Sequence, residues 1–517
     1  GLARTLLDTA RPGDAADALR RAVALEPGRA DLLLDLAATA GRAQRTADAA
    51  AALDHALALE PGNAAALGQS VQQRLRLCAW DGLAEREAAL LAALRAGAAG
   101  VPPFALLGMD SSPADQRLAA ERWAEQRTAG VTPVGRVPAV PGDGRIRIGY
   151  LSGDFHEHAV AHLIAELLER HDRGRFAVTA WSTGIDDGSA MRRRLMAAVE
   201  RFEDLSTLSD ADAARRIAGA GTDILVDLTG YTAFARTAIP AARPAPVQVN
   251  WLGYPGTMGA PFIDAIIADA ATIPPEDEPH YSESVVRLPH SYQPNDRQRA
   301  IAAETPPRAA LGLPEDGFVF CCFNSPYKIR PAVFDVWARL LHAVPGSVLW
   351  LYAAEPLVCG NLGREAVRRG LDPRRLVYAP PLPSAQHLAR HRAADLFLDT
   401  LPYNAHTTGS DSLWAGLPMV TCRGAAFAGR VAAGLLGAAG LPELVADDLA
   451  GYEALALALA RDPNRLAALR ERLAAQRDTC PLFDSARFAR DLEAVYTRLH
   501  EEHRRRAALR FAGTPAG

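Results

Sequence analysis

The chain has 517 residues, which is too many for one hydrophobic core and predicts two to four domains. Its contents of hydrophobic residues (49%) and charged residues (22%) are ordinary for a soluble globular protein, and a net charge of -4 argues against non-specific binding to nucleic acid. The chain contains no run of about 18 uninterrupted apolar residues, so the sequence predicts no membrane-spanning segment.

Six cysteines are scattered along the chain without the spacing of a metal site, and two of them, Cys321 and Cys322, stand in an apolar stretch. This usage predicts a reducing, cytoplasmic location. The first residue is glycine rather than methionine, so the sequence leaves open whether a targeting segment preceded it.

The N-terminal region repeats itself. The tetrapeptide Leu-Glu-Pro-Gly occurs at residues 25–28 and again at 59–62, an offset of 34, and small and apolar residues match at the same offset. This period, with a closing proline, resembles a tetratricopeptide repeat; a generic alanine-rich bundle is the alternative. We assign residues 1–75 to these repeats, which are too few for a free-standing solenoid. Either the chain is truncated, or these helices pack against the rest of the chain. We assign residues 76–144 to a helical bridging segment and linker.

From residue 145 onward, apolar strands alternate with amphipathic helices, which predicts parallel sheets covered by helices on both faces. A polar, proline-rich stretch divides this pattern into two α/β domains, at 145–305 and 306–484, followed by a C-terminal helix and tail at 485–517. Two doubly wound, Rossmann-like domains in succession place a ligand between them, at the carboxyl ends of the strands. The expected strands are 145–151, 176–181, 223–228, 246–251, 264–268 and 284–288, then 317–323, 347–352, 375–378, 395–398 and 418–421.

Lys328 is the single lysine among 56 basic residues. Lysine is a compact point charge where arginine is a planar fork, and a buried diphosphate is one ligand that can require the compact shape. The alternative is that this lysine has no function and is present by chance. Lys328 follows the first strand of the second α/β domain, so its loop and the loop at 399–414 are expected to open on the same crevice.

The loop at 399–414 has the composition of an anion site. A strand runs into it and a helix is expected to begin near Thr408, so His406, Thr407 and Thr408 stand where free backbone amides point outward. Asp411 lies one turn into the helix, where it can accept hydrogen bonds from a ribose. An ordinary helix cap formed by Thr407 or Thr408 is the alternative.

In the first α/β domain the notable loop carries His156, His158 and His162. Their spacing does not match the His-Glu-x-x-His motif and offers no clear third ligand, so we predict no metal. We expect one histidine to point into the crevice and to contact the hydroxyl group of an acceptor substrate. The pair Asp210 and Asp212 matches the Asp-x-Asp pattern of metal-dependent transferases, but its helical setting predicts a surface position.

Neither α/β domain begins with Gly-x-Gly-x-x-Gly after its first strand, which argues against an enzyme that uses NAD or FAD. Residues 251–259 instead contain three glycines after a strand. Glycine lets the backbone approach a ligand closely, and its mixture with aromatic residues suits a sugar pocket. A plain turn is the alternative.

Six stretches of this sequence are similar to the O-linked N-acetylglucosamine transferase and Spindly family, and the resemblance covers nearly the whole chain. It implies two domains of the glycosyltransferase-B type, a uridine diphosphate sugar donor, inversion at the anomeric carbon, and no metal or other cofactor. The six stretches are 154–162, 227–232, 243–257, 323–329, 398–420 and 430–433.

The resemblance also implies roles for individual residues. Lys328 would bind the diphosphate and His158 would serve on the catalytic or acceptor side. The nucleotide would be bound by the base-contacting His387, by His406, Thr407 and Thr408 at the phosphates, and by Asp411 at the ribose, while the backbone at Leu252, Gly253 and Pro255 would line the sugar.

This chain departs from the animal enzymes at three positions near the expected site. Ser325 stands in place of a glutamine, Ser384 in place of a lysine, and Tyr403 in place of a cysteine in the sugar pocket. These changes affect the expected nucleotide affinity and, above all, the expected sugar.

We therefore predict an enzyme that transfers N-acetylglucosamine from UDP-GlcNAc to Ser or Thr of proteins, with the helical repeats presenting the polypeptide acceptor. The partners are then a nucleotide sugar and a protein, with no nucleic acid and no membrane. Alternatives are transfer from GDP-fucose to a hydroxyl or from UDP-glucose to asparagine, a sugar-nucleotide 2-epimerase, and a non-catalytic repeat adaptor that binds nucleotide.

Overall fold

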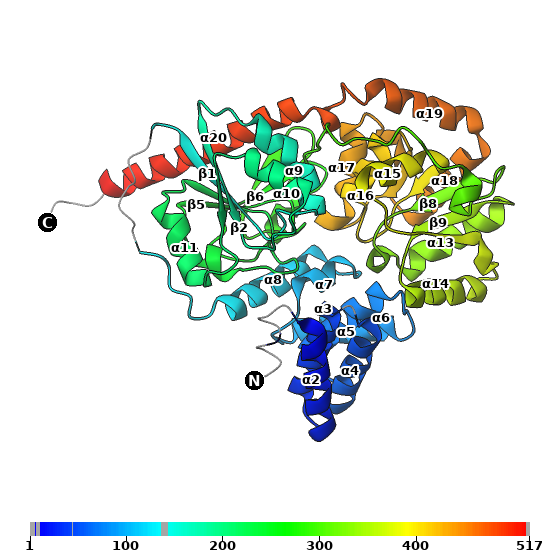
Figure 1. Ribbon diagram of the computed structural model, residues 1–517, viewed down its shortest axis with the longest axis horizontal. Coiled ribbons are helices and arrows are strands. Elements are labelled where there is room, and N and C mark those ends of the chain that lie inside the picture. Colours follow the sequence, from blue (N-terminus) through cyan, green and yellow to red (C-terminus); the bar gives the residue numbers. More distant parts are fainter. Residues whose placement is uncertain (1–5, 7–10, 44, 136–142, 513–517) are drawn as a thin grey trace.

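The computed structural model describes residues 6, 11–43, 45–135 and 143–512. The first ten residues of the expected repeats, apart from residue 6, lie outside the described part of the chain, as do residues 136–142 of the expected bridging segment and linker and the end of the tail. In Figure 1 the helical N-terminal region projects from a body made of two α/β domains that lie side by side.

Antiparallel helices form the N-terminal region. Helices α2 (Pro12–Leu25) and α4 (Thr46–Leu59) end at the two Leu-Glu-Pro-Gly tetrapeptides, and α3 (Ala30–Arg42) and α5 (Ala64–Arg76) come after them. The matched small residues are buried where helices meet, for example Ala15 and Ala49. Helices α6 (Leu83–Arg95), α7 (Pro103–Leu107) and α8 (Pro113–Thr128) continue toward the α/β domains.

The helices that follow the predicted repeats contact both α/β domains. The Arg330 guanidinium forms a largely buried ion pair with Glu87 of α6, and Cys78 donates a hydrogen bond to the carbonyl oxygen of Pro326 at 3.4 Å. Arg117 of α8 donates to the carbonyl oxygen of Pro279 in the first α/β domain at 2.6 Å. The helical region therefore contacts both sides of the crevice between the domains.

Each α/β domain is built on a wholly parallel sheet. The first sheet has seven strands in the order β3-β2-β1-β4-β5-β6-β7, and the second has six in the order β10-β9-β8-β11-β12-β13. The first sheet comprises β1 (Ile146–Ser152), β2 (Phe176–Ser182), β3 (Arg201–Asp204), β4 (Ile224–Asp227), β5 (Val247–Asn250), β6 (Ala265–Asp269) and β7 (Ser284–Leu288). The second comprises β8 (Val319–Cys322), β9 (Val348–Tyr352), β10 (Leu376–Ala379), β11 (Leu396–Leu398), β12 (Met419–Cys422) and β13 (Val445–Ala446).

The eleven strands expected from the sequence are all present, and two further strands were missed. Strand β3 is a partly exposed edge strand with the sequence Arg-Phe-Glu-Asp, and β13 has only two residues. Neither presents the continuous apolar run that identifies a strand buried on both faces.

Helices cover both faces of the sheets and alternate with the strands along the chain. In the first domain these are α9 (Ala159–Arg170), α10 (Ala190–Ala197), α11 (Asp210–Gly219) and α12 (Ala238–Ala241). In the second they are α13 (Pro331–Ala343), α14 (Pro356–Arg368), α15 (Ser384–Arg390), α16 (Thr407–Trp414), α17 (Val431–Ala438) and α18 (Leu449–Arg461).

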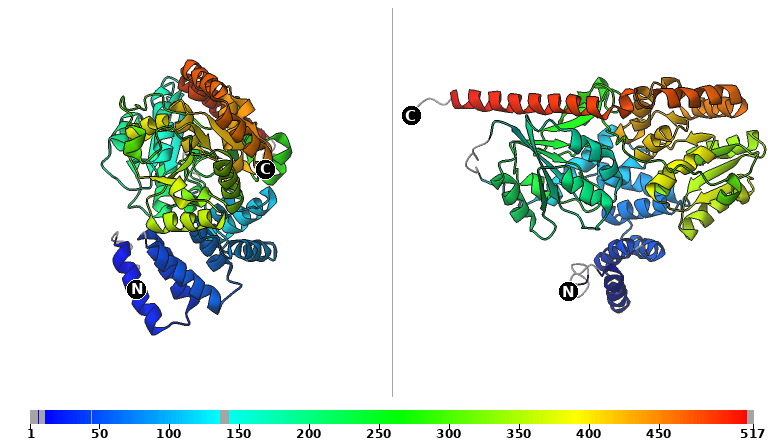
Figure 2. Two further views of the ribbon diagram at one scale, coloured as in Figure 1. Left: turned by 90° about the vertical axis from the view of Figure 1, so that its right-hand side faces the viewer. Right: turned by 45° about the horizontal axis from the view of Figure 1, so that its top comes forward.

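The chain ends by crossing back to the first domain. Helix α19 (Pro463–Gln476) covers the second domain, and the long α20 (Ser485–Ala512) runs along the first, as Figure 2 shows from above. Two buried contacts fix α20 there. Tyr496 and Tyr150 have their hydroxyls 3.1 Å apart, and the Glu493 carboxylate lies 3.1 Å from Nδ1 of His171.

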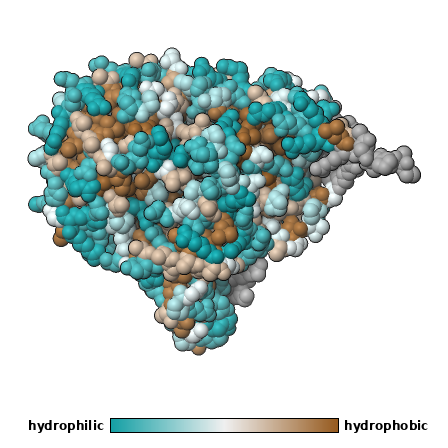
Figure 3. Space-filling view, turned by 180° about the vertical axis from the view of Figure 1, so that it is seen from behind, coloured by the Kyte–Doolittle hydropathy of each residue, from teal (hydrophilic) through white to brown (hydrophobic). Residues whose placement is uncertain are grey.

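Among the described residues, no helix is both long and apolar enough to cross a membrane. On the face seen from behind, hydrophobic residues form small separate areas among hydrophilic ones (Figure 3).

Candidate functional site

A cavity of about 630 Å³ lies where the carboxyl ends of the two sheets face each other. In each sheet the strand order reverses between two neighbouring strands, β1 and β4 in the first and β8 and β11 in the second, and ligands bind at such switch points. The loops after these strands line the cavity. Nine of the twelve predicted site residues are among its lining residues: His158, Leu252, Gly253, Ser325, Lys328, Tyr403, His406, Thr407 and Thr408.

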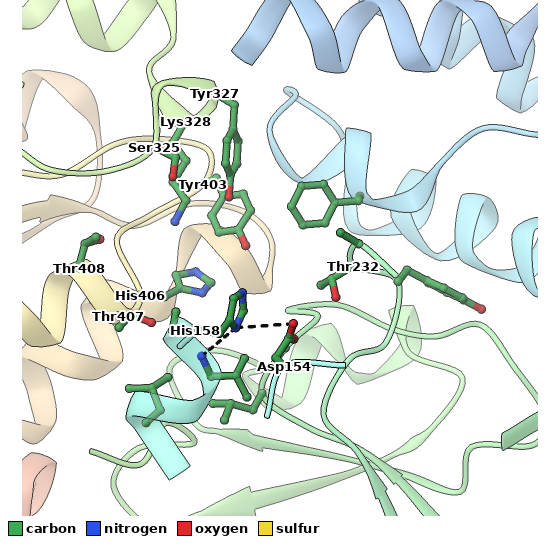
Figure 4. A pocket seen from close by; sticks show the side chains of 18 of the residues that line it. Asp154, His158, Thr232, Ser325, Tyr327, Lys328, Tyr403, His406, Thr407 and Thr408 are labelled. Atoms are coloured by element: carbon green, nitrogen blue, oxygen red, sulfur yellow. Dashed lines mark hydrogen bonds and ion pairs between the residues drawn. The ribbon is translucent and has the colours of Figure 1, made fainter. Parts of the chain in front are cut away.

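Figure 4 shows how the two domains contribute. Ser325, Lys328 and Tyr403 lie on one side of the cavity with His406, Thr407 and Thr408, all from the second domain. His158 and Asp154 face them from the first domain.

Lys328 is the buried cation of the site. It ends the short helix η3 (Pro326–Lys328), which begins four residues after β8, and it is 8% exposed. Its Nζ donates a hydrogen bond to the carbonyl oxygen of Asn404 at 2.8 Å and lies 4.0 Å from the centre of the Tyr403 ring. Burial lowers the pKa of Lys328 to about 8, and the nearby Asp399 carboxylate opposes this shift. Such a poorly solvated cation gains much from an anionic ligand.

The loop beside Lys328 is held in place by Asp399, the residue directly after β11. Its carboxylate accepts hydrogen bonds of 2.6 Å from the hydroxyl of Thr421 and from the amide of Ala405, and burial raises its pKa to about 6. Asn324, two residues after β8, donates to Asp399 at 3.1 Å and accepts from the Thr408 hydroxyl. Neither Asp399 nor Asn324 was singled out in the sequence, although each is a polar residue just after a buried strand.

The N-terminus of α16 forms the other part of this anion site. His406 is the residue that precedes the helix, and its Nε2 lies 3.1 Å from the carbonyl oxygen of Ala428, to which it donates. Burial, with the charge of Lys328 adding to it, keeps the pKa of His406 well below its usual value. His406 is therefore neutral, and the first amides of the helix at Thr407 and Thr408 are available for a phosphate oxygen.

His158 caps a helix in the first domain rather than standing free. Its Nδ1 accepts the backbone amide of Val160 at 3.2 Å at the start of α9, which leaves the ring proton on Nε2. Burial lowers the pKa of His158, so the neutral form dominates. Nε2 is then a hydrogen-bond donor and not a base.

Asp154 is the neighbouring group that the sequence did not bring forward. Its carboxylate lies 3.8 Å from His158 Nδ1, and it is 9% exposed and lines the cavity. Burial raises the pKa of Asp154, against the opposing charges of His158 and His156. A carboxylate that is poorly solvated and reaches the cavity is suited to accept a proton.

The glycine-containing loop after β5 approaches the cavity at Leu252 and Gly253. Leu252 has a φ of 76°, and a Cβ added to Gly253 would lie 1.9 Å from the carbonyl oxygen of Leu228. Only glycine fits at that position, as expected for close backbone packing. Pro255 is buried behind the loop and lies outside the lining of the cavity.

His387 and Asp411 also lie outside the lining of this cavity and form a separate cluster. His387 Nε2 is 4.0 Å from Asp411, whose other carboxylate oxygen accepts a hydrogen bond from the buried Arg299. Burial lowers the pKa of His387 to about 3. Arg299, which no sequence pattern singled out, thus pairs with one oxygen of Asp411, the residue that was predicted to bind the ribose.

A second cavity, of about 1020 Å³, adjoins this cluster. Several residues between 302 and 311 line it, together with Trp350, Tyr378 and Arg390. Arg390 contacts His387 Nδ1, and the Nε of Arg390 and the Nε1 of Trp350 are buried without hydrogen-bond partners among the described residues.

Within the part of the chain that the structure describes, no group of three His, Cys, Asp or Glu residues is arranged to hold a metal ion. His162 pairs with Glu157 at 2.5 Å, while His158 caps α9. Asp210 and Asp212 lie at the start of α11 and pair with arginines, at the surface position expected from the sequence.

Comparison with known proteins gives a consistent result. The sequence matches the family described as glycosyl transferase family 41 over residues 136–305 and 292–492. It is 38% identical over 365 residues to a probable UDP-N-acetylglucosamine--peptide N-acetylglucosaminyltransferase SEC of Arabidopsis thaliana, covering 69% of this chain and 37% of that protein. It is 31% identical over 482 residues to the UDP-N-acetylglucosamine--peptide N-acetylglucosaminyltransferase of Caenorhabditis elegans, covering 70% of this chain and 42% of that one.

The chain therefore spans less than half the length of these curated relatives. Among solved structures, a mutant of the Thermobaculum terrenum O-GlcNAc transferase superposes with a TM-score of 0.79 at 31% identity, covering 98% of this chain and 97% of that one.

Proposed function

Because the chain belongs to glycosyl transferase family 41, we propose that it transfers N-acetylglucosamine from UDP-GlcNAc to Ser or Thr hydroxyls of a polypeptide. The observation that carries the proposal is the position of Lys328. Its buried ammonium group lies with the start of α16 on one side of the cavity, and Asp154 and His158 lie on the other. A diphosphate leaving group and an acceptor hydroxyl can thus be bound opposite each other.

In this proposal the diphosphate lies between Lys328 and the first amides of α16, where the ammonium group and the helix dipole both stabilise negative charge. The acceptor oxygen forms a bond to the anomeric carbon as the bond from that carbon to the diphosphate oxygen breaks. Attack from the face opposite the leaving group inverts the anomeric configuration. UDP leaves with the electron pair of the broken bond, and Lys328 neutralises the charge that a metal ion would otherwise bind.

We assign the acceptor's proton to Asp154 and give His158 an orienting role. His158 Nε2 carries a hydrogen and can donate it to the acceptor oxygen or to the sugar, but it cannot also take a proton. No described residue donates a hydrogen bond to the Asp154 carboxylate, and Nδ1 of His158, 3.8 Å away, carries no proton to donate. It is therefore free to accept the hydroxyl proton as the new bond forms.

For the nucleotide we propose that Asp411 and His387, with Arg299 beside them, bind the ribose and the base. Asp411 keeps one carboxylate oxygen for a ribose hydroxyl while the other accepts from Arg299. Ser325 and the backbone at Leu252, Gly253 and Pro255 complete the donor site. The six cysteines all carry free thiols, which supports a reducing, cytoplasmic setting.

Tyr403 favours one alternative, a different donor sugar. Its ring lies under Lys328 Nζ and within 4.9 Å of the His406 ring, where it occupies volume beside the diphosphate. A bulky side chain there changes the shape of the sugar pocket. Transfer of a sugar other than N-acetylglucosamine, from UDP or from GDP, is therefore the second candidate.

The test combines binding with transfer. The full chain is titrated with UDP and with GDP by calorimetry, then incubated with UDP-GlcNAc and a library of Ser/Thr peptides, with Ala-substituted peptides as controls. We expect tighter binding of UDP and one N-acetylhexosamine on the hydroxyl-bearing peptides, detected by mass spectrometry. Preference for GDP would indicate another donor. UDP binding without transfer to any peptide or protein would indicate a non-catalytic adaptor, and epimerisation of free UDP-GlcNAc would indicate a small-molecule enzyme.

A further inference from the structure

One wall of the cavity comes from neither α/β domain. Gln72 and Arg76 of α5, Pro102, Phe104 of α7 and Trp123 of α8 all line it. The donor's diphosphate is accounted for by Lys328 and α16, which lie in the second domain. The helical wall is therefore left to contact the other substrate.

Arg76 is the charged residue of this wall. It is the last residue of α5, it is exposed, and its guanidinium forms no ion pair or hydrogen bond with any described residue. Arg74 in the same helical turn is engaged instead, with Asp54 and with the carbonyl oxygen of Asp81. A cation left unpaired at the edge of a cavity is available for an anionic group of a ligand.

The same wall contains aromatic residues, one of which contacts a second cation. Arg76 lines the cavity together with Tyr327, the residue that precedes Lys328. Burial raises the pKa of Tyr327 to about 12, while its hydrogen bond with Tyr403 and the charge of Arg76 act to lower it. On the other side of the wall, the Arg127 guanidinium lies 4.3 Å from the centre of the Trp123 ring. Arg127, like Arg76, forms no ion pair among the described residues.

The acidic group of the cavity lies on the opposite wall, where Asp154 precedes α9. The cavity is thus acidic where the acceptor hydroxyl would react and basic where flanking acceptor residues would extend toward α5 and α8. This arrangement attracts an acceptor with a negative charge beside the modified residue and repels one with a positive charge there.

We propose that Arg76, in the wall formed by α5, α7 and α8, selects acceptor segments that have a carboxylate side chain close to the modified Ser or Thr. The proposal rests on the proposed function, because it requires a polypeptide acceptor. It adds the chemical class of that acceptor: an acidic segment with an apolar or aromatic neighbour that can pack on Phe104 and Trp123.

The test uses three peptides that share one Ser in a neutral sequence and differ only in Glu, Gln or Lys at the positions next to it. Transfer from UDP-GlcNAc is measured on the full chain, and KM for the peptide is separated from kcat. We expect kcat/KM to be about tenfold higher for the Glu peptide than for the Lys peptide, mainly through KM, which corresponds to about 1.4 kcal/mol. The ratio should decrease as salt is added.

Arg76→Glu should reverse the order of the Glu and Lys peptides and leave UDP affinity unchanged. Arg21→Glu is the matched control, since Arg21 is an exposed arginine of α2 that has no ion pair among the described residues and does not line the cavity. It makes the same change in net charge and should leave the order as in the wild type.

Three results would overturn the inference. Equal use of the three peptides by the wild type, or a preference that Arg76→Glu does not alter, would show that Arg76 does not read the acceptor. Loss of UDP binding in Arg76→Glu would assign Arg76 to the donor instead. Absence of transfer to all peptides, the neutral one included, would reject the proposed function itself, and is distinguishable because it does not depend on charge.

Discussion

The two α/β domains share one architecture but bring opposite kinds of polar groups to the cavity. In the second domain, Lys328, Asn324 and Asp399 are buried and joined to each other's loops by hydrogen bonds. In the first, Asp154 and His158 reach the cavity with few partners. The comparison indicates that the second domain provides a fixed electrostatic site, whereas the first provides a carboxylate, Asp154, that remains free to accept a proton. Preorganised charge and available proton acceptors are different requirements of the same transfer reaction.

The largest expected effect is on the fixed site. Lys328→Met removes the buried charge and keeps a slim side chain beside Tyr403, so we expect the fold to remain and turnover to fall by at least about 10²–10³-fold. Turnover with UDP-GlcNAc and the thermal unfolding temperature check this prediction. Ser325→Ala, an uncharged change in the same cavity wall, is the control and should alter turnover only a few-fold. Near-normal turnover in Lys328→Met would remove the electrostatic mechanism.

The second prediction concerns the proton acceptor in the first domain. Asp154→Asn keeps the size of the side chain but cannot take a proton, so we expect kcat to fall by about 10²-fold while UDP affinity is unchanged. The pKa of Asp154 is raised, so in the wild type the rate should fall as the pH decreases and the carboxylate becomes protonated. That acidic decline should be absent from the residual rate of Asp154→Asn.

His158→Ala separates the two roles. If His158 orients the acceptor and Asp154 takes the proton, His158→Ala retains the acidic decline and loses less activity than Asp154→Asn. A larger loss of activity in His158→Ala than in Asp154→Asn, with loss of the acidic decline, would indicate that His158 is the base.

The third and smallest effect is the pH dependence of nucleotide binding. The pKa of Lys328 in the ligand-free protein is about 8, so it loses its proton as the pH rises above that value, while the diphosphate, with phosphate pKa values near or below about 6, stays fully charged. UDP affinity should be nearly constant between pH 7 and 8 and then weaken by up to about tenfold for each further unit. Calorimetric titrations from pH 7 to 9.5 measure this.

Lys328→Met supplies the control for that titration. It should bind UDP more weakly and show no change of slope near pH 8. A constant UDP affinity up to pH 9.5 in the wild type would mean that Lys328 stays charged in the free protein, or that it does not contact the diphosphate.

The burial of a strand decides whether its sequence pattern can be recognised. Strands such as β8 are continuous apolar runs, so burial on both faces makes them visible, whereas the polar edge strand β3 and the two-residue β13 are not. The predicted residues Lys328 and His406 come after strands next to a switch point, and chain topology alone brings them to one cavity.

The pairing of side chains could not be predicted from the sequence. Nothing in the local pattern shows that Arg299 pairs with Asp411 across 112 positions, or that Nδ1 of His158 accepts the amide of Val160. Both contacts depend on the packing of distant or irregular segments, and both decide which proton or charge a predicted residue can still offer. The sequence could predict which loops lie at the cavity, whereas the hydrogen-bond partners of their residues required the structure.

The links between the helical region and the α/β domains have a mechanical consequence. The buried pair of Arg330 and Glu87 ties α6 to the second domain, Arg117 ties α8 to the first, and α19 and α20 span the two domains on the opposite side. A hinge that opened the crevice widely would have to break one of these two braces, and separating a buried ion pair is costly. These links oppose a wide opening of the crevice, so under the proposed function we expect UDP and the modified segment to leave through its open edge, without separation of the domains.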